Sequence, residues 1–85
     1  MQFGFLATES YYVDHLVSIW LALPKKARGP FFCSHTAAEA AFRYGVNPGK
    51  VVYVSGNRKQ IAKTLRVSGF KGPVLTASFS NWRIS

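Results

Sequence analysis

The chain has 85 residues, 48% of them apolar and 15% aromatic, and eleven Lys and Arg residues face only three acidic ones. This length allows a single domain, over residues 1–85, and the apolar content is that of a folded chain rather than a disordered one. No apolar run reaches the roughly 18 residues that a membrane-spanning helix needs. No basic segment precedes an apolar one at the amino terminus, so we expect no secretory signal.

The net charge of +8 is the strongest compositional signal. A protein this basic favours a polyanion such as nucleic acid, a phosphorylated ligand, an anionic membrane surface or an acidic protein partner. The alternative is a solvated basic surface without a function, or a fragment whose acidic half is missing. The single cysteine, Cys33, excludes an internal disulfide framework and predicts a reducing, cytoplasmic compartment.

The first 23 residues predict a strand followed by a helix. Residues 2–7 form a short apolar run, and residues 8–10 interrupt it with three small or polar side chains. From Tyr11 to Leu23 apolar residues recur three or four positions apart, which is the period of an amphipathic helix. Because strands buried on both faces read as continuous apolar runs, we expect this strand in the middle of a parallel sheet.

The rest of the chain repeats the alternation of strand and helix. We predict further strands over residues 31–33, 51–54 and 73–77, and helices over 37–44 and 58–68. Thr36 and Glu39 have the spacing of a capping box at the start of the second helix, and Asn57 is a good N-cap for the third. Gly45 and Gly69 fit the left-handed position that ends a helix.

This order of elements predicts an α/β fold of three layers, with a four-stranded parallel Rossmann-like sheet and three helices. We favour the strand order 3-2-1-4, with the flavodoxin-like order 2-1-3-4 as the alternative. The favoured order leaves the fourth strand at an edge, and the apolar Phe79, Trp82 and Ile84 follow it without an element to cover them. We therefore expect a protein partner at this edge: the remainder of a larger domain, a second copy of the chain, or a different protein.

Small polar residues follow every predicted strand. The carboxyl ends of parallel strands meet at one edge of the sheet, where open α/β folds bind ligands, so we expect a ligand- or anion-binding site there. Turns and helix caps use the same residue types for local reasons, and that reading stays open. The candidate residues are Thr8, Glu9, Ser34, His35, Ser55, Gly56, Asn57, Arg58, Lys59 and Ser78.

Residues 55–59 are the best anion candidate, because a glycine, the free N–H groups of a helix start and two cations come together. They match neither a Walker A loop nor a dinucleotide fingerprint. We expect His15 to be exposed and Cys33 to be an inert buried thiol. No combination of nucleophile, base and orienting acid can be assembled, so we expect no catalytic residue, cofactor or metal site.

The chain resembles the opening of CDP-glycerol glycerophosphotransferase-like proteins, relatives of teichoic-acid polymerases that include phage-encoded members. The matching residues are Phe3-Gly-Phe-Leu-Ala-Thr-Glu9, Tyr11-Tyr-Val-Asp-His-Leu16, Ile19-Trp20, Ala22-Leu-Pro24, Val74-Leu-Thr-Ala-Ser-Phe79, Asn81 and Arg83. Family members carry an acid where this chain has Asn81.

The resemblance implies the first, acceptor-side part of a two-domain GT-B transferase, with a viral origin as one expectation. The His-Gly motif of the family and its donor-binding domain would lie beyond residue 85, so the resemblance implies no catalysis by residues 1–85 alone. Two hypotheses follow. The chain is the amino-terminal portion or remnant of a GT-B-type glycosyl- or glycerophosphotransferase, or it is a small basic module that binds nucleic acid or an acidic protein.

Overall fold

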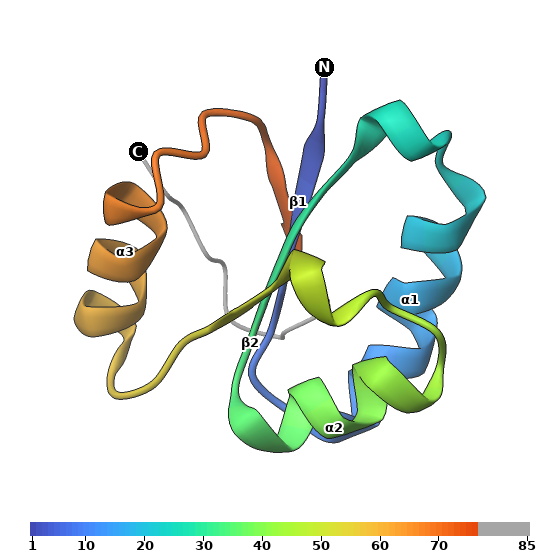
Figure 1. The fold of residues 1–85 in the computed structure, drawn as a ribbon. Helices are drawn as coiled ribbons and strands as arrows, with labels where there is room; N and C mark the ends of the chain where they lie inside the picture. Colours follow the sequence, from blue (N-terminus) through green and yellow to red (C-terminus); the bar gives the residue numbers. More distant parts are fainter. Residues whose placement is uncertain (77–85) are drawn as a thin grey trace.

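A computed structural model of the chain describes residues 1–76, and these form a four-stranded sheet flanked by three helices (Figure 1). The strands are β1 (Phe3–Ala7), β2 (Arg28–Cys33), β3 (Val51–Tyr53) and β4 (Val74–Thr76), all parallel, in the order β3-β2-β1-β4. The helices are α1 (Val13–Ala22), α2 (His35–Arg43) and α3 (Arg58–Val67). The predicted class and the favoured strand order are therefore confirmed, and the order 2-1-3-4 is excluded.

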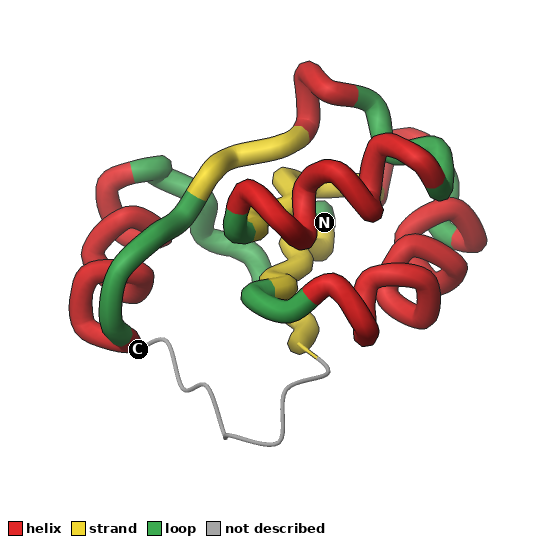
Figure 2. Tube along the Cα trace, turned by 90° about the horizontal axis from the view of Figure 1, so that it is seen from below, coloured by secondary structure: helices red, strands yellow, loops and turns green. Residues whose placement is uncertain are grey.

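The helices divide between the two faces of the sheet, as Figures 1 and 2 show. Helices α1 and α2, which connect the first three strands, cover one face, and α3, which connects β3 to β4, covers the other. Three short 3-10 turns complete the connections: η1 (Ser10–Tyr12), η2 (Lys25–Ala27) and η3 (Pro48–Lys50). Within residues 1–76 we find no helix of sufficient length and apolarity to span a membrane.

The register of β1 explains why its sequence is continuously apolar. Phe5 lies beside Phe31 of β2 and Leu75 of β4, and its side chain enters the core on the α1 and α2 side. The next residue, Leu6, lies beside Phe32 and enters the core on the α3 side. Because strand side chains alternate between faces, a central strand covered on both faces needs apolar residues throughout.

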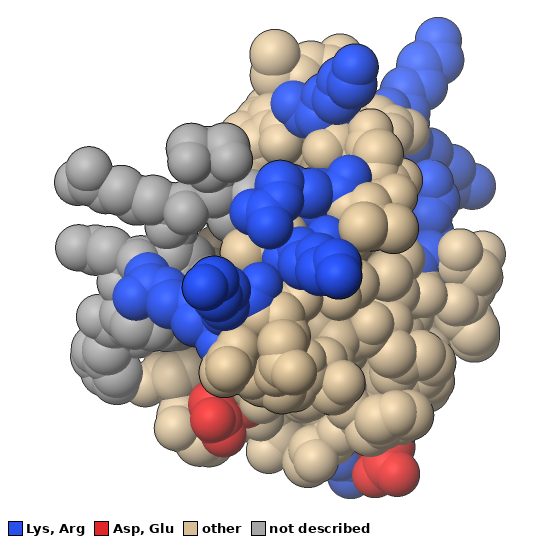
Figure 3. Space-filling model, turned by 90° about the vertical axis from the view of Figure 1, so that its left-hand side faces the viewer, with Lys and Arg blue, Asp and Glu red and all other residues tan. Residues whose placement is uncertain are grey.

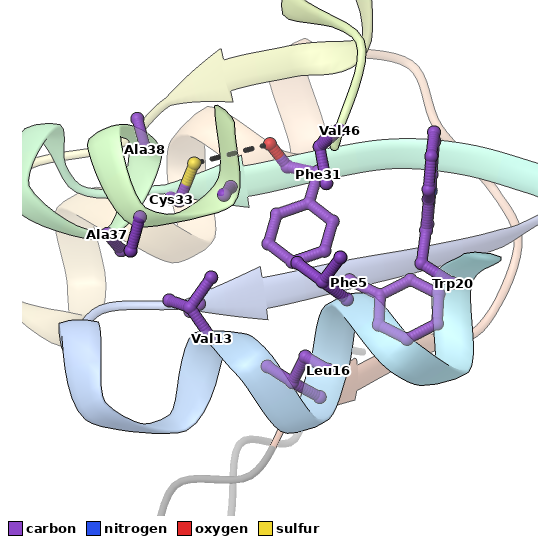
Figure 4. Packing of buried hydrophobic residues seen from close by; sticks show 13 residues of the cluster. Phe5, Val13, Leu16, Trp20, Phe31, Cys33, Ala37, Ala38 and Val46 are labelled. Atoms are coloured by element: carbon purple, nitrogen blue, oxygen red, sulfur yellow. Dashed lines mark hydrogen bonds between the residues drawn. The ribbon is translucent and has the colours of Figure 1, made fainter. Parts of the chain in front are cut away.

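The larger core lies between the sheet and helices α1 and α2 (Figure 4). The rings of Phe5 and Phe31 stack with centroids 5.7 Å apart and planes 3° from parallel, and Trp20 meets Phe31 edge-on at 6.5 Å. The indole Nε1 of Trp20 donates a hydrogen bond to the carbonyl of Gly29 at 3.1 Å, so this buried polar group is satisfied. Four buried alanines let α2 lie close to the sheet: Ala37, Ala38, Ala40 and Ala41.

The smaller core lies between the sheet and α3. Its buried members are Leu6, Phe32, Val54, Ile61 and Leu65. Phe70, just past the end of α3, packs against this core with its ring over Gly4, where an added Cβ would lie 2.7 Å from the Phe70 ring.

The apolar pattern of the sequence predicts six core residues, and five of them are buried: Phe5, Leu16, Val54, Ile61 and Leu65. The sixth, Val52, is only half-buried, because β3 is an edge strand of the described sheet.

Two predicted helix starts are wrong. Helix α1 begins at Val13, after the 3-10 turn η1, and not at Tyr11. Helix α2 begins at His35 with Ser34 as its N-cap, so the expected capping box of Thr36 and Glu39 does not form. Ser34 comes directly after β2, and its Oγ accepts a hydrogen bond from the N–H of Ala37 at 3.2 Å, which starts the helix two residues early.

The helix ends follow the predicted glycine pattern. Gly45 has a φ of 107°, and the N–H groups of Gly45 and Val46 donate to the carbonyls of Phe42 and Ala41, as in a Schellman motif. Gly69 ends α3 with a φ of 77°, but here a side chain intervenes. The N–H of Phe70 donates to the Ser68 hydroxyl, which in turn donates to the carbonyl of Leu65.

Candidate functional site

The carboxyl ends of β1 and β2 are tied together by a predicted site residue. The hydroxyl of Ser34 donates to the carbonyl of Thr8 at 3.0 Å while it accepts from the first turn of α2. The structure therefore brings Thr8 and Ser34 together as expected, and gives Ser34 two structural roles. Glu9, the next residue along the chain, is exposed.

His35 forms the next part of this edge. Its imidazole stacks on the ring of Tyr53 with centroids 4.5 Å apart and planes 19° from parallel, and both side chains are exposed. The pair joins the start of α2 to the end of β3. The sequence analysis missed Tyr53, although it is the one aromatic residue within the predicted strand 51–54. The contact between Tyr53 and His35 depends on the register of β2 with β3, which sets Tyr53 beside Cys33 at the end of β2. The sequence alone does not give this register.

Residues 55–59 comprise the turn before α3 and the first two residues of the helix. Here backbone N–H groups proposed for anion binding form hydrogen bonds within the chain. The side chain of Gln60 accepts from the N–H of Asn57 at 2.7 Å, and that of Asn57 accepts from the N–H of Gln60 at 3.0 Å. Asn57 is thus the predicted N-cap, in a capping box that the sequence analysis did not identify. Two of the N–H groups that an anion would use are already bonded within the helix.

Gly56 has a positive φ of 88°, a conformation that glycine adopts readily and that the predicted anion site would use. A side chain at this position would be strained, and its Cβ would overlap the Gln60 amide that closes the capping box. The glycine is therefore explained by the helix start, whether or not a ligand binds. Ser78, the last predicted site residue, lies outside the described residues, as do Phe79, Trp82 and Ile84.

A basic surface covers α3 and the turn after it. We call this surface the basic face; Figure 3 shows Lys and Arg side chains gathered on this side of the molecule. Its members are the exposed side chains of Arg58, Lys59, Lys63, Arg66 and Lys71.

The distribution of charge along the chain is uneven. Residues 1–39 contain three basic and three acidic side chains, whereas residues 40–85 contain eight basic and no acidic ones. The whole net charge therefore comes from the second half of the chain. The spacing of Arg58, Lys59, Lys63 and Arg66 predicts a basic outer surface on the third helix from the sequence alone, and the lack of any acidic residue after Glu39 is readable there too.

Cys33 and His15 are placed as expected. The Cys33 thiol is fully buried beneath α2 and donates to the carbonyl of Phe31 at 3.7 Å (Figure 4). Burial raises the pKa of this thiol to about 12, which makes it a poor nucleophile at neutral pH. His15 is exposed on α1. Among residues 1–76 no three His, Cys, Asp or Glu side chains gather closely enough to hold a metal ion.

Comparison with known proteins finds no match: no family model, no curated protein and no solved structure resembles the chain significantly. The resemblance to glycerophosphotransferase-like proteins therefore stays a prediction.

Proposed function

We propose that this chain is a non-catalytic domain that binds the phosphate backbone of nucleic acid through the basic face of α3. The observation that carries the proposal is the uneven charge. Five exposed cations lie on and just after one helix, in a half of the chain that contains no acidic residue to neutralise them. These cations repel one another, and a bound polyanion reduces this repulsion. Binding also releases the counterions that surround the polyanion.

The composition of the face favours phosphates over bases. Proteins that bind single strands by stacking place aromatic rings among their cations. The large exposed aromatic side chains of the described chain, Tyr11, Tyr44 and Tyr53, belong to other elements. Contacts to phosphate position a protein without reading sequence, so we expect binding that is nearly independent of sequence.

Salt dependence tests the proposal directly. Binding of a fluorescein-labelled DNA duplex, followed by anisotropy, should weaken steeply between 50 and 200 mM salt. If four or five phosphates are neutralised, the slope of log K against log salt should be about −4. A duplex of scrambled sequence should bind equally well.

A matched pair of variants separates the basic face from net charge. Lys59→Gln with Lys63→Gln removes two cations from α3, and Lys26→Gln with Arg43→Gln removes two exposed cations elsewhere. We expect the first pair to weaken duplex binding at least tenfold and the second to have little effect. Equal losses from both pairs, or tighter binding to an acidic polypeptide such as polyglutamate than to the duplex, would overturn the proposal.

A second candidate function is the amino-terminal, acceptor-side portion of a GT-B-type transferase. The observation that favours it is the edge at β4. An apolar hollow of about 150 Å³ lies beside this strand, lined by Phe3, Phe5, Ile19, Leu23 and Leu75. A further element of a larger Rossmann-like domain would cover it, and apolar surface of this kind gains from burial.

The reading frame decides this second candidate. A frame that continues beyond codon 85 into a His-Gly motif and a second Rossmann-like domain would support it, and the longer product should transfer glycerophosphate from CDP-glycerol. A frame that stops at codon 85, with a product that sediments as a monomer, would exclude it.

A further inference from the structure

We propose that the chain has a separate site for a phosphomonoester dianion, at the opposite edge of the sheet from the residues that the sequence singled out. A hollow of about 270 Å³ lies where α1 ends and β2 begins, near the amino-terminal ends of the strands. Its walls include Trp20, Leu21, Lys25, Arg28, Asn47 and Lys50. We call it the amino-edge hollow.

Arg28 is held rigidly at this hollow. Its Nε donates to the carbonyls of Trp20 at 3.1 Å and Leu23 at 3.0 Å, and its Nη2 donates to the carbonyl of Leu21 at 2.7 Å. The guanidinium also lies 5.1 Å from the centroid of the Trp20 ring. It therefore neutralises the carbonyl end of α1 and is oriented before any ligand arrives. Among residues 1–76, its Nη1 donates to no acceptor.

The other polar groups of the hollow are donors with capacity left over. The ammonium group of Lys50 gives one hydrogen bond, to the carbonyl of Arg28 at 3.2 Å, and has two further N–H donors. The carbonyl oxygen of the Asn47 side chain accepts from the N–H of Gly49 at 2.9 Å, so its amide NH₂ remains as a donor. Lys25 is exposed and adds a third cation.

The positive charge around the amino-edge hollow favours a doubly charged anion as the ligand. Three cations surround the amino-edge hollow, and none of the three acidic residues of the chain lines it. A carboxylate would supply one negative charge, whereas a phosphomonoester supplies nearly two at neutral pH and three acceptor oxygens, which suit the remaining donors on Arg28, Lys50 and Asn47. The exposed side chain of Leu21 gives the same hollow an apolar wall, which suits the organic part of an ester.

This site is independent of the proposed nucleic-acid surface. The basic face belongs to α3, and the hollow is built by α1, η2, β2 and η3 on the other side of the sheet. Failure of either proposal therefore leaves the other intact, since their test variants do not overlap.

Trp20 provides a reporter for the experiment. In a Trp82→Phe background Trp20 is the only tryptophan of the chain, and its ring contacts both Arg28 and the hollow. Titration with inorganic phosphate and with phenyl phosphate at constant ionic strength should give a saturable change in its fluorescence. Sodium chloride at the same ionic strength should give none. We expect phenyl phosphate to bind more tightly than inorganic phosphate because of the Leu21 wall.

Matched lysine variants locate the binding. Lys25→Gln and Lys50→Gln should each raise the dissociation constant for phenyl phosphate by about three- to tenfold, as expected for one charge-assisted contact near the surface. Lys71→Gln, which lowers the net charge equally, should leave it unchanged. Lys25 is exposed and makes no hydrogen bond to residues 1–76, so its replacement should not affect folding even if that of Lys50 does.

The protonation state of the ligand gives a second readout. Because a phosphomonoester loses its second charge below its pKa of about 6, binding should weaken between pH 7.5 and pH 5. The proposal is overturned if Lys25→Gln binds as well as the parent chain, if Lys71→Gln is weakened as much, or if chloride reproduces the fluorescence change.

Discussion

The two faces of the sheet differ in how much apolar surface they bury and in how much charge they carry. Among residues 1–76, the side of α1 and α2 buries thirteen apolar residues, including the stacked Phe5 and Phe31, whereas the side of α3 buries five. The outer surface of α3 carries the basic face, and the first 39 residues, which include α1, have no net charge. Stability therefore depends mainly on one side of the sheet, which leaves the outer surface of the other side free to carry mutually repelling cations.

The largest loss of stability is expected from a substitution at Phe31, in the larger core. This residue is fully buried between β1 and Trp20, so Phe31→Ala should lower the free energy of unfolding by about 3–5 kcal/mol through lost burial and an unfilled cavity. Urea denaturation followed by circular dichroism measures this directly. A loss below about 1 kcal/mol would show that the larger core does not dominate stability.

Two leucines allow a matched comparison of the faces. Leu16 and Leu65 are equally buried, at 3% exposure each, and lie in the larger and the smaller core respectively. Replacement by alanine should lower the free energy of unfolding by about 4 kcal/mol at Leu16 and by about 2 kcal/mol at Leu65. These values lie in the upper and lower parts of the range for buried leucines. The smaller core has fewer buried residues, so the side chains around Leu65 can move more easily into the cavity that the substitution leaves. Equal losses would remove the distinction between the faces.

The start of α3 allows stability and duplex binding to be measured separately on the α3 side of the sheet. Asn57→Ala removes the acceptor for the N–H of Gln60 and should destabilise the chain by about 1 kcal/mol. If the capping box is purely structural, duplex binding should not change beyond this loss of stability. Thermal unfolding and anisotropy on the same sample would separate the two effects, and Asn57→Ser, which can still cap, is the control.

Cys33 gives the smallest effect at neutral pH and one that grows in alkali. Its pKa is raised in the folded chain to about 12, whereas an unfolded thiol ionises near pH 8.5. Above that pH the unfolded chain releases a proton that the folded chain keeps, so stability should fall as the pH rises toward 12. Urea titrations at pH 7 and pH 10 should show a larger loss for the parent chain than for Cys33→Ala. Rapid reaction of the folded chain with a thiol reagent at pH 8 would contradict this.

The architecture was readable from the sequence because its signals are local and repeat. Each strand contains a short apolar run, although β2 begins three residues before its run, at Arg28. Each of the last two helices ends in a glycine followed by an apolar residue, Val46 or Phe70. The continuous apolar character of β1 predicted an inner strand, which the structure confirms, but β1 is an inner strand in both 3-2-1-4 and 2-1-3-4, so this feature alone did not decide between the two orders. Helix starts were less certain, since Ser34 and Thr36 are both good caps and the end of β2 decides between them.

The candidate sites were harder to predict for physical reasons. The candidate residues at the carboxyl edge that lie within residues 1–76 do follow their strands, yet the side chains of Ser34 and Asn57 form hydrogen bonds with backbone groups. The amino-edge hollow joins Lys25, Arg28 and Lys50, which come from η2, β2 and η3. No spacing pattern in the sequence marks residues that meet only through tertiary packing.

The ring of Phe70 has a consequence for how the sequence can vary between relatives. It lies over two glycines at once: a Cβ added at Gly4 would lie 2.7 Å from the ring, and one added at Gly72 would lie 2.6 Å from it. Gly4 is the second residue of β1, and Gly72 lies two residues before β4, the strand that pairs with β1. In chains descended from a common ancestor, a larger residue at position 4 should therefore appear together with a smaller one at position 70. At position 72 such an exchange would not suffice, because the backbone carbonyl of Gln2 also occupies the space.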